Sequence, residues 1–122
     1  MAQRKLENLD VWNDARFFVV DIYRMMYNVR DYGFKDQIQR AAVSIMNNIA
    51  EGFESGFDVQ FAHFLNIAKG SCSEVKSMLF LCQDLKYCTE EKRIELYDKL
   101  YNISSKIYNL STYLKKQNRV FG

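Results

Sequence analysis

The sequence contains no proline, only five glycines and a single histidine. A β-sandwich or β-barrel needs a supply of turn residues that this composition does not provide, so all-β folds are excluded. The absence of proline also favours long helices without interruption. With one histidine, the chain has no repeated Glu-x-x-His pair of the kind found in di-iron bundles, and we expect neither a metal site nor a cofactor.

Long apolar runs are missing as well. The longest, residues 78–82, is far shorter than the about 20 residues that a membrane-spanning helix needs, and no apolar stretch of signal-peptide length follows the basic start of the chain. We therefore expect a cytoplasmic protein with no membrane partner. The three cysteines, Cys72, Cys82 and Cys88, are spaced neither as a disulfide framework nor as Cys-x-x-Cys metal ligands, so buried free thiols are the simplest interpretation.

The abundant residues define a core and a mild charge. Apolar residues make up 48% of the 122 residues, enough for one folded domain over residues 1–122. The formal net charge is +2, from 17 basic and 15 acidic side chains, which is too small to indicate a nucleic-acid partner by itself. The basic surplus lies near the C-terminus, because no acid follows Asp98 whereas several cations do: Lys99, Lys106, Lys115, Lys116 and Arg119.

Apolar positions repeat every three or four residues in four segments, which is the period of an amphipathic helix. We predict helices over residues 9–29, 35–54, 58–87 and 90–117. Asp31 and Gly33 favour a turn after the first helix, Gly56 and an N-cap Asp58 separate the second from the third, and Thr89 caps the fourth. Because the connections are short, neighbouring helices should run antiparallel, and the predicted fold is an all-α, up-down-up-down four-helix bundle.

Two of the predicted helices carry more apolar surface than one core-facing stripe requires. The third has a second stripe that comprises Phe64, Ile67, Ser71, Met78, Leu81 and Leu85, and the fourth adds Tyr97, Tyr101 and Tyr108 beside its main stripe. Such a surplus either thickens the core or is covered by another subunit. We expect self-association into a homo-oligomer.

Residues 37–52 and 61–74 are rich in small and polar side chains where a simple bundle would use leucine. Gly70 lies inside the third predicted helix, where glycine costs about 1 kcal/mol relative to alanine, so a close approach of the second and third helices is the expected reason. Polar side chains around it are expected to hydrogen-bond between the two helices or to the backbone: Asn48, Glu51, Ser71 and Glu74. The alternative is that these groups line a ligand pocket.

The same two segments carry a resemblance to a known family. The strings Asn48-Ile49-Ala50-Glu51-Gly52 and Gly70-Ser71-x-x-Glu74, with Arg40-Ala41-Ala42 before them and Leu9-Asp10-Val11-Trp12 at the start, resemble the bacterial 23S rRNA intervening-sequence proteins. The resemblance spans nearly the whole chain and implies a closed ring, typically a homopentamer of four-helix bundles, without catalytic activity. Some members are encoded inside intervening sequences of large-subunit rRNA genes. A related branch, the accessory variability determinants of diversity-generating retroelements, forms basic pentamers that bind nucleic acid and a reverse transcriptase.

No enzymatic motif accompanies this resemblance, because the serines have no second histidine to activate them and no Gly-rich loop precedes a helix. The expected function is therefore a non-enzymatic, oligomeric scaffold for RNA or an RNA–protein assembly. Its partner would be RNA or DNA, with no small-molecule substrate.

Candidate phosphate contacts are cations near the two ends of the chain: Lys106, Lys115, Lys116 and Arg119, with Arg4 and Lys5 as neighbours. Tyr108 and Tyr113 are candidates for stacking on unpaired bases. Two alternatives stay open. The basic segment is also typical of a solvated helix end that complements the helix dipole, and the apolar stripes also suit a protein-interaction adaptor that takes a partner helix in a groove.

Overall fold

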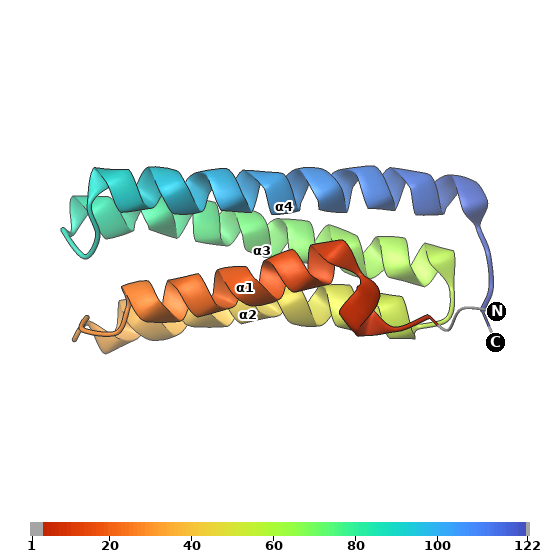
Figure 1. The fold of residues 1–122 in the computed structure, drawn as a ribbon, viewed down its shortest axis with the longest axis horizontal. Coiled ribbons are helices and arrows are strands. Elements are labelled where there is room, and N and C mark those ends of the chain that lie inside the picture. Colours follow the sequence, from red (N-terminus) through yellow and green to blue (C-terminus); the bar gives the residue numbers. More distant parts are fainter. Residues whose placement is uncertain (1–3, 122) are drawn as a thin grey trace.

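The computed structural model describes residues 4–121 and contains four long helices. They are α1 (Asp10–Met25), α2 (Tyr32–Glu54), α3 (Asp58–Asp84) and α4 (Glu90–Gln117), and a single 3-10 turn, η1 (Leu6–Asn8), precedes them (Figure 1). Residues 1–3 and Gly122, which the predicted domain 1–122 includes, lie outside the described residues. The all-α prediction is confirmed, since the extended pairing between Phe57 and Val120 is an isolated bridge.

The helices form an antiparallel bundle in which each packs against the helices before and after it, and α4 closes the square against α1. Consequently α1 and α3 lie on one diagonal and α2 and α4 on the other. The first and last described residues, Arg4 and Phe121, lie together at the same end of the bundle (Figure 1). The predicted up-down-up-down fold is confirmed. Within residues 4–121, none of the helices combines the length and the apolar character needed to cross a membrane.

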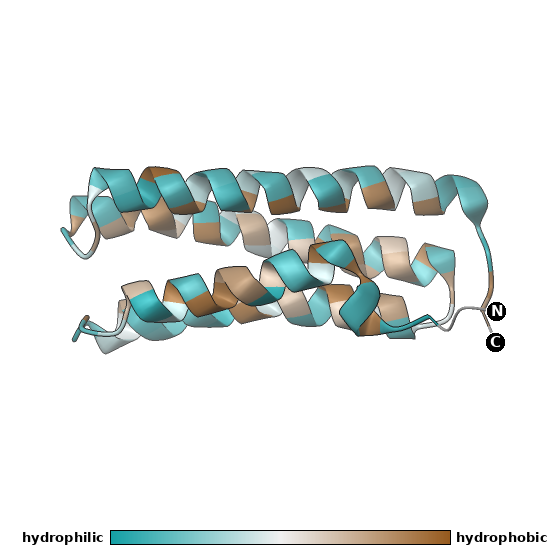
Figure 2. Cartoon of the chain, viewed as in Figure 1, coloured by the Kyte–Doolittle hydropathy of each residue, from teal (hydrophilic) through white to brown (hydrophobic). Residues whose placement is uncertain are grey.

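The core follows the apolar period of the sequence. Figure 2 shows hydrophobic positions recurring along every helix between hydrophilic ones. The side chains that solvent does not reach include Ile22 of α1, Ile38 and Ile45 of α2, and Leu65 and Leu79 of α3. Because a fully buried aliphatic side chain contributes about 1.5–3 kcal/mol, these layers supply most of the free energy that holds the helices together.

Helix ends agree with the prediction where a local cap defines them. Helix α4 has the predicted bounds, and the Thr89 hydroxyl accepts a hydrogen bond from the backbone N–H of Lys92 at 3.1 Å. Helix α2 begins at Tyr32 rather than residue 35, because the Asp31 carboxylate accepts from the N–H of Phe34 at 3.2 Å and so caps the helix earlier.

Two helices end earlier than predicted. Helix α1 ends at Met25 rather than residue 29, and the turn that follows keeps Val29 half-buried against the core, so the apolar period continues without the helix. Helix α3 ends at Asp84 rather than residue 87, because Lys86 adopts a left-handed φ of 64° and the N–H of Tyr87 bonds back to the carbonyl of Cys82 at 2.9 Å. This is the bonding pattern of a Schellman C-cap.

The predicted reason for Gly70 is wrong. A Cβ built at Gly70 would meet nothing within 4 Å, because this residue lies on the exposed face of α3. The close approach is at Gly52 instead, where a Cβ would lie 2.8 Å from a ring atom of Phe61 and 2.9 Å from the Cβ of Phe64. Glycine is therefore needed on α2, at the end where α2 and α3 are joined.

The predicted hydrogen bonds between α2 and α3 are confirmed only in part. The hydroxyls of Ser44 and Ser71 lie 2.9 Å apart across the two helices. The Asn48 amide bonds to the backbone, which was the other predicted possibility: it donates to the Ser44 carbonyl of its own helix at 2.8 Å, and also to the Ser44 hydroxyl at 3.0 Å. Glu51 and Glu74 are exposed and make no side-chain hydrogen bond within residues 4–121, because their positions on the helices face solvent.

Candidate functional site

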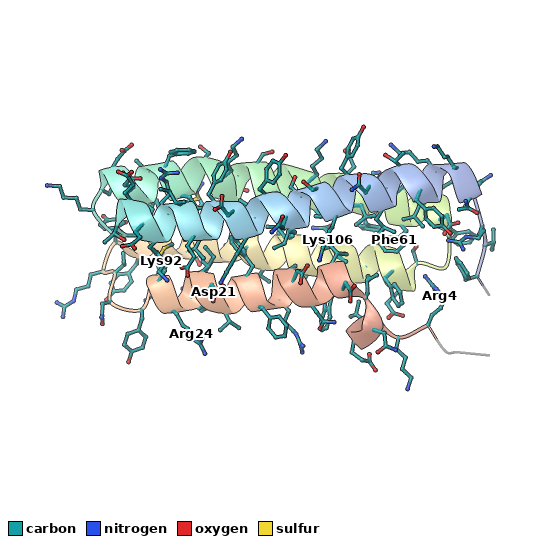
Figure 3. The ribbon with its side chains drawn as sticks, turned by 45° about the horizontal axis from the view of Figure 1, so that its top comes forward. Arg4, Asp21, Arg24, Phe61, Lys92 and Lys106 are labelled. Carbon is teal, nitrogen blue, oxygen red and sulfur yellow. The ribbon has the colours of Figure 1, made fainter. Side chains whose placement is uncertain are left out.

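The predicted cations gather at one end of the bundle. The last turn of α4 carries Lys115 and Lys116, and the chain ends bring Arg4, Lys5 and Arg119 to the same end. Lys106 lies nine residues before Lys115, or roughly 14 Å along the helix, so it belongs to the middle of the bundle (Figure 3). Five of the six candidates therefore share one surface region, which we call the basic end.

Arg119 has a partner inside the protein. The side chain of Asp58 is only 1% exposed, and its Oδ2 accepts from Arg119 Nε at 2.8 Å and from the Arg119 backbone N–H at 2.7 Å. Burial alone would raise the pKa of Asp58, but the hydrogen bonds and charge of Arg119 outweigh burial and lower that pKa. The prediction that Asp58 is an N-cap is wrong. It is the first residue of α3, and its carboxylate fixes the C-terminal tail.

The rest of the tail and the N-terminal segment close over the same point. The N–H of Phe121 donates to the carbonyl of Gly56 at 2.5 Å. The Arg4 guanidinium lies between two rings, 4.4 Å from the centroid of Phe53 and 4.1 Å from that of Phe121, and donates to the Phe53 carbonyl at 3.2 Å. The Arg4 side chain is thus held in place by two aromatic rings and a backbone carbonyl.

On the side of the bundle between α1 and α4, the lysines of α4 are neutralised by aspartates of α1. Lys106 pairs with Asp14, and Lys99 pairs with Asp21 at 2.9 Å. The hydrogen bond to Asp14 raises the pKa of Lys106. These pairs border an open hollow of about 520 Å³ between the two helices. Lys5, Lys115 and Lys116, by contrast, are exposed and form no ion pair within the described part of the chain.

The opposite flank of α4 carries cations that are absent from the predicted set. Lys69 and Lys76 of α3 and Arg93 of α4 each lie over an aromatic ring, and the surrounding surface includes three tyrosines of α4. We call this surface the α3–α4 seam, defined by Lys69, Lys76, Arg93, Tyr97, Tyr101 and Tyr108. A signal was present in the sequence, because Lys69 and Lys76, like Tyr101 and Tyr108, are seven residues apart and so share a helix face.

Apolar side chains remain exposed on the two diagonal helices. On α1 and the turn that follows it these are Phe17, Val20, Tyr23 and Tyr27, and on α3 and its C-cap residue they are Ile67, Leu81 and Leu85. We call these sets the α1 patch and the α3 patch. Of the second stripe predicted for the third helix, Met78 is buried and Phe64 and Ser71 are half-buried, so this stripe partly thickens the core and partly faces solvent.

The groups that would suit catalysis or metal binding are scattered. Among residues 4–121 there is no group of three or more histidine, cysteine or carboxylate side chains placed to hold a metal ion. His63 is exposed beside Phe64. Cys72 and Cys82 are free and buried as predicted, whereas Cys88 is free but only half-buried, and burial raises the pKa of Cys72 to about 12.

Comparisons with known proteins agree with this architecture. A model of the 23S rRNA-intervening sequence protein family matches residues 7–118. Among solved structures, the crystal structure of a protein with unknown function from the S23 ribosomal protein family of Bacteroides thetaiotaomicron is similar, with 25% sequence identity and a TM-score of 0.77. The similarity covers 83% of this chain and 97% of that one. A search of curated proteins gave no match.

Proposed function

Because the chain belongs to the 23S rRNA-intervening sequence protein family, we propose that it is a non-enzymatic scaffold that associates with copies of itself and holds RNA. The assembly proposed is a closed ring, a homopentamer, acting in the cytoplasm. The RNA would be held by phosphate contacts at the basic end. RNA binding depends on self-association in this proposal, because the basic end of each subunit has only a few exposed cations and a ring brings several copies of them together on one particle.

One observation carries the proposal, namely that the α1 patch and the α3 patch lie on diagonal helices. A ring of identical subunits needs two different surfaces on each copy, so that the first surface of one copy meets the second surface of the next. Patches on two helices that do not pack against each other are separate surfaces, and they meet that requirement. Their exposed aromatic and aliphatic side chains are also typical of the apolar centre of an interface.

Sedimentation of single variants tests this arrangement. Val20→Glu places a charge in the α1 patch and Leu81→Glu places one in the α3 patch, so each variant is expected to sediment as a monomer. Ile94→Glu is the matched control, since Ile94 on α4 is 43% exposed, as Leu81 is 44% exposed, but lies outside both patches. This control should assemble like the unaltered chain.

Mixing the two variants gives a sharper result. In a head-to-tail ring, the intact α3 patch of Val20→Glu can still meet the intact α1 patch of Leu81→Glu, so the mixture should form dimers and stop there. In a two-fold dimer each interface uses one patch on both copies, and mixing restores nothing. Monomers in the mixture, or a monomeric unaltered chain at micromolar concentration, would contradict the ring.

Binding at the basic end is tested separately. Filter binding of labelled RNA at two salt concentrations should show an affinity that falls with salt, and Lys115→Gln with Lys116→Gln should weaken it and reduce the salt slope by about 0.7 for each lost contact to a single strand. The matched control removes two charges at the opposite end of the bundle, with Arg30→Gln and Lys86→Gln, and should bind normally. No affinity at low salt would remove RNA from the proposal.

The competing function is a protein-interaction adaptor in which the exposed apolar patches take a helix of another protein. Capture from a lysate with and without nuclease distinguishes the two. A partner retained after RNA is destroyed, together with a monomeric chain, would favour the adaptor.

A further inference from the structure

The α3–α4 seam differs from the opposite flank of α4 in having cations without partner carboxylates. Lys69 and Lys76 form no ion pair with any acid in residues 4–121, whereas Lys99 and Lys106 on the other flank of α4 are paired with aspartates. The two hollows along the seam, of about 180 Å³ and 90 Å³, are lined by residues that include no aspartate or glutamate. The positive charge of this seam is therefore not compensated by its own lining.

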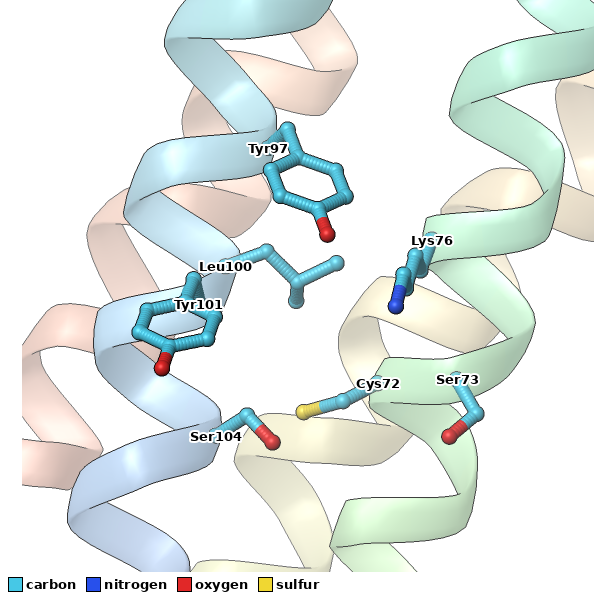
Figure 4. A pocket seen from close by; sticks show the side chains of 7 residues that line it. All are labelled: Cys72, Ser73, Lys76, Tyr97, Leu100, Tyr101 and Ser104. Carbon is cyan, nitrogen blue, oxygen red and sulfur yellow. The ribbon is translucent and has the colours of Figure 1, made fainter.

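Aromatic rings accompany these cations. The Lys69 ammonium lies 5.0 Å from the ring centroid of Tyr108, and the Lys76 ammonium lies 5.5 Å from that of Tyr97. Farther along, Arg93 lies 4.7 Å from the ring of Phe80. Figure 4 shows Lys76 reaching from α3 toward the gap that Tyr97 and Tyr101 border on α4. Cation and ring thus alternate along the length of the two helices.

The rings remain available to a ligand. Tyr101 is 65% exposed and Tyr108 is 58% exposed, so each has a free surface besides the contact with its neighbouring side chain. Small polar side chains line the two hollows beside these rings: Ser73, Ser104, Ser111 and Thr112. The hollows are far smaller than the about 300–1,000 Å³ that enclose a small-molecule ligand, which favours a long ligand lying on the surface.

We propose that the α3–α4 seam binds an unpaired nucleic-acid strand, with phosphates against Lys69, Lys76 and Arg93 and bases stacked on Tyr101 and Tyr108. This inference rests on the proposed RNA-binding function and names the form of RNA and the surface that holds it. Single strands are bound by basic grooves that carry aromatic side chains, because every unpaired base presents a flat face to a ring. A duplex keeps its bases stacked inside, so it would use the lysines but not the tyrosines.

The seam is long enough for several nucleotides and leads to the basic end. From Arg93 to Lys115 it runs 22 residues of α4, or roughly 33 Å. Lys115 borders its last hollow together with Lys69 and Tyr108, so a strand that leaves the seam arrives at the basic end. The seam also lies on the α4 side of α3, away from the Ser71 side that faces α2.

Fluorescence titration of the full chain with labelled oligouridine of about 20 nucleotides tests the inference, since this length exceeds the seam. Tyr101→Ala should weaken binding about tenfold without changing the salt slope, because stacking releases no counterions. Lys69→Gln with Lys76→Gln should lower the salt slope by about 1.4, the value for two contacts to a single strand. Tyr101→Phe keeps the ring and should bind within about twofold of the unaltered chain.

Matched controls and competing ligands make each outcome decisive. Tyr32→Ala removes an exposed tyrosine at the other end of the bundle and should bind normally. Oligouridine, and oligothymidine of equal length, should both bind more tightly than a duplex RNA. If the chain binds RNA but the seam variants bind as the unaltered chain does, or if duplex is preferred, the inference is overturned and the proposed function stands. If no RNA binds at all, both are overturned.

Discussion

Replacing each of two glycines by alanine should change stability in opposite directions. At Gly52 the added methyl group would lie 2.8 Å from a Phe61 ring atom, 2.9 Å from the Phe64 Cβ and 3.1 Å from the Phe61 carbonyl oxygen. The last two atoms cannot rotate away, so the helices must separate. Overpacking of this kind costs about 1–3 kcal/mol, and the gain of about 1 kcal/mol in helix propensity offsets part of it. Because two of the three close atoms are fixed, the cost falls in the upper part of that range, about 2–3 kcal/mol, and we expect Gly52→Ala to be destabilised by about 1–2 kcal/mol.

Gly70→Ala is the matched control, because it makes the same substitution in the interior of the neighbouring helix. Nothing lies within 4 Å of the added methyl group, so only the helix propensity changes and the variant should gain about 0.5–1 kcal/mol. Urea unfolding followed by circular dichroism measures both, at one fixed protein concentration because association would shift the midpoint. A Gly52→Ala chain as stable as the unaltered one, or a destabilised Gly70→Ala, would refute the assignment of the close approach to Gly52.

Three further predictions concern buried and half-buried polar groups. Asp58→Asn should cost about 1.5–3 kcal/mol at pH 7 through loss of the charge-assisted bonds to Arg119. Because the pKa of Asp58 is lower in the folded state, this stabilisation is present above the usual carboxyl pKa of about 3.9 and disappears as the pH falls through the folded-state pKa. The urea midpoints of the variant and the unaltered chain should therefore converge in acid. Ser44→Ala and Ser71→Ala should each cost about 1 kcal/mol and the double variant less than their sum, as a double-mutant cycle would show; strict additivity would contradict the shared hydrogen bond. The Cys72 thiol, whose pKa burial raises to about 12, should react with a disulfide reagent at pH 8 only after unfolding, and rapid labelling of the native chain would be incompatible with its burial.

The sequence predicted features whose partners are near one another in the chain. The start of α4 was correctly placed from Thr89, whose hydroxyl accepts from the backbone N–H of Lys92 only three residues away. The apolar period likewise identified the buried face of each helix, because that period is fixed by helix geometry. The end of α1 could not be placed in this way, since Val29 continues the apolar period after the helix has ended.

Features that depend on distant partners could not be predicted from local pattern. Asp58 has the residue type of an N-cap, but its bond to Arg119 spans 61 positions, and only the folded bundle brings the two together. Lys106 has the pattern of a free phosphate contact, yet it meets Asp14 across 92 positions. A charge read from sequence therefore shows which side chains are ionised but not which of them remain uncompensated after folding.

That distinction explains how a chain of net charge +2 can carry uncompensated positive charge on one side only of helix α4. Helix α4 has two flanks with cations on both. Toward α1 the aspartates of that helix neutralise Lys99 and Lys106, whereas toward α3 the cations meet rings that leave their charge in place. A ring holds a cation by about 0.5–1 kcal/mol at an exposed site, so the cation can turn to a phosphate at little cost. The even balance of acids and bases therefore reflects one flank that is neutralised and another that is left open to an anion.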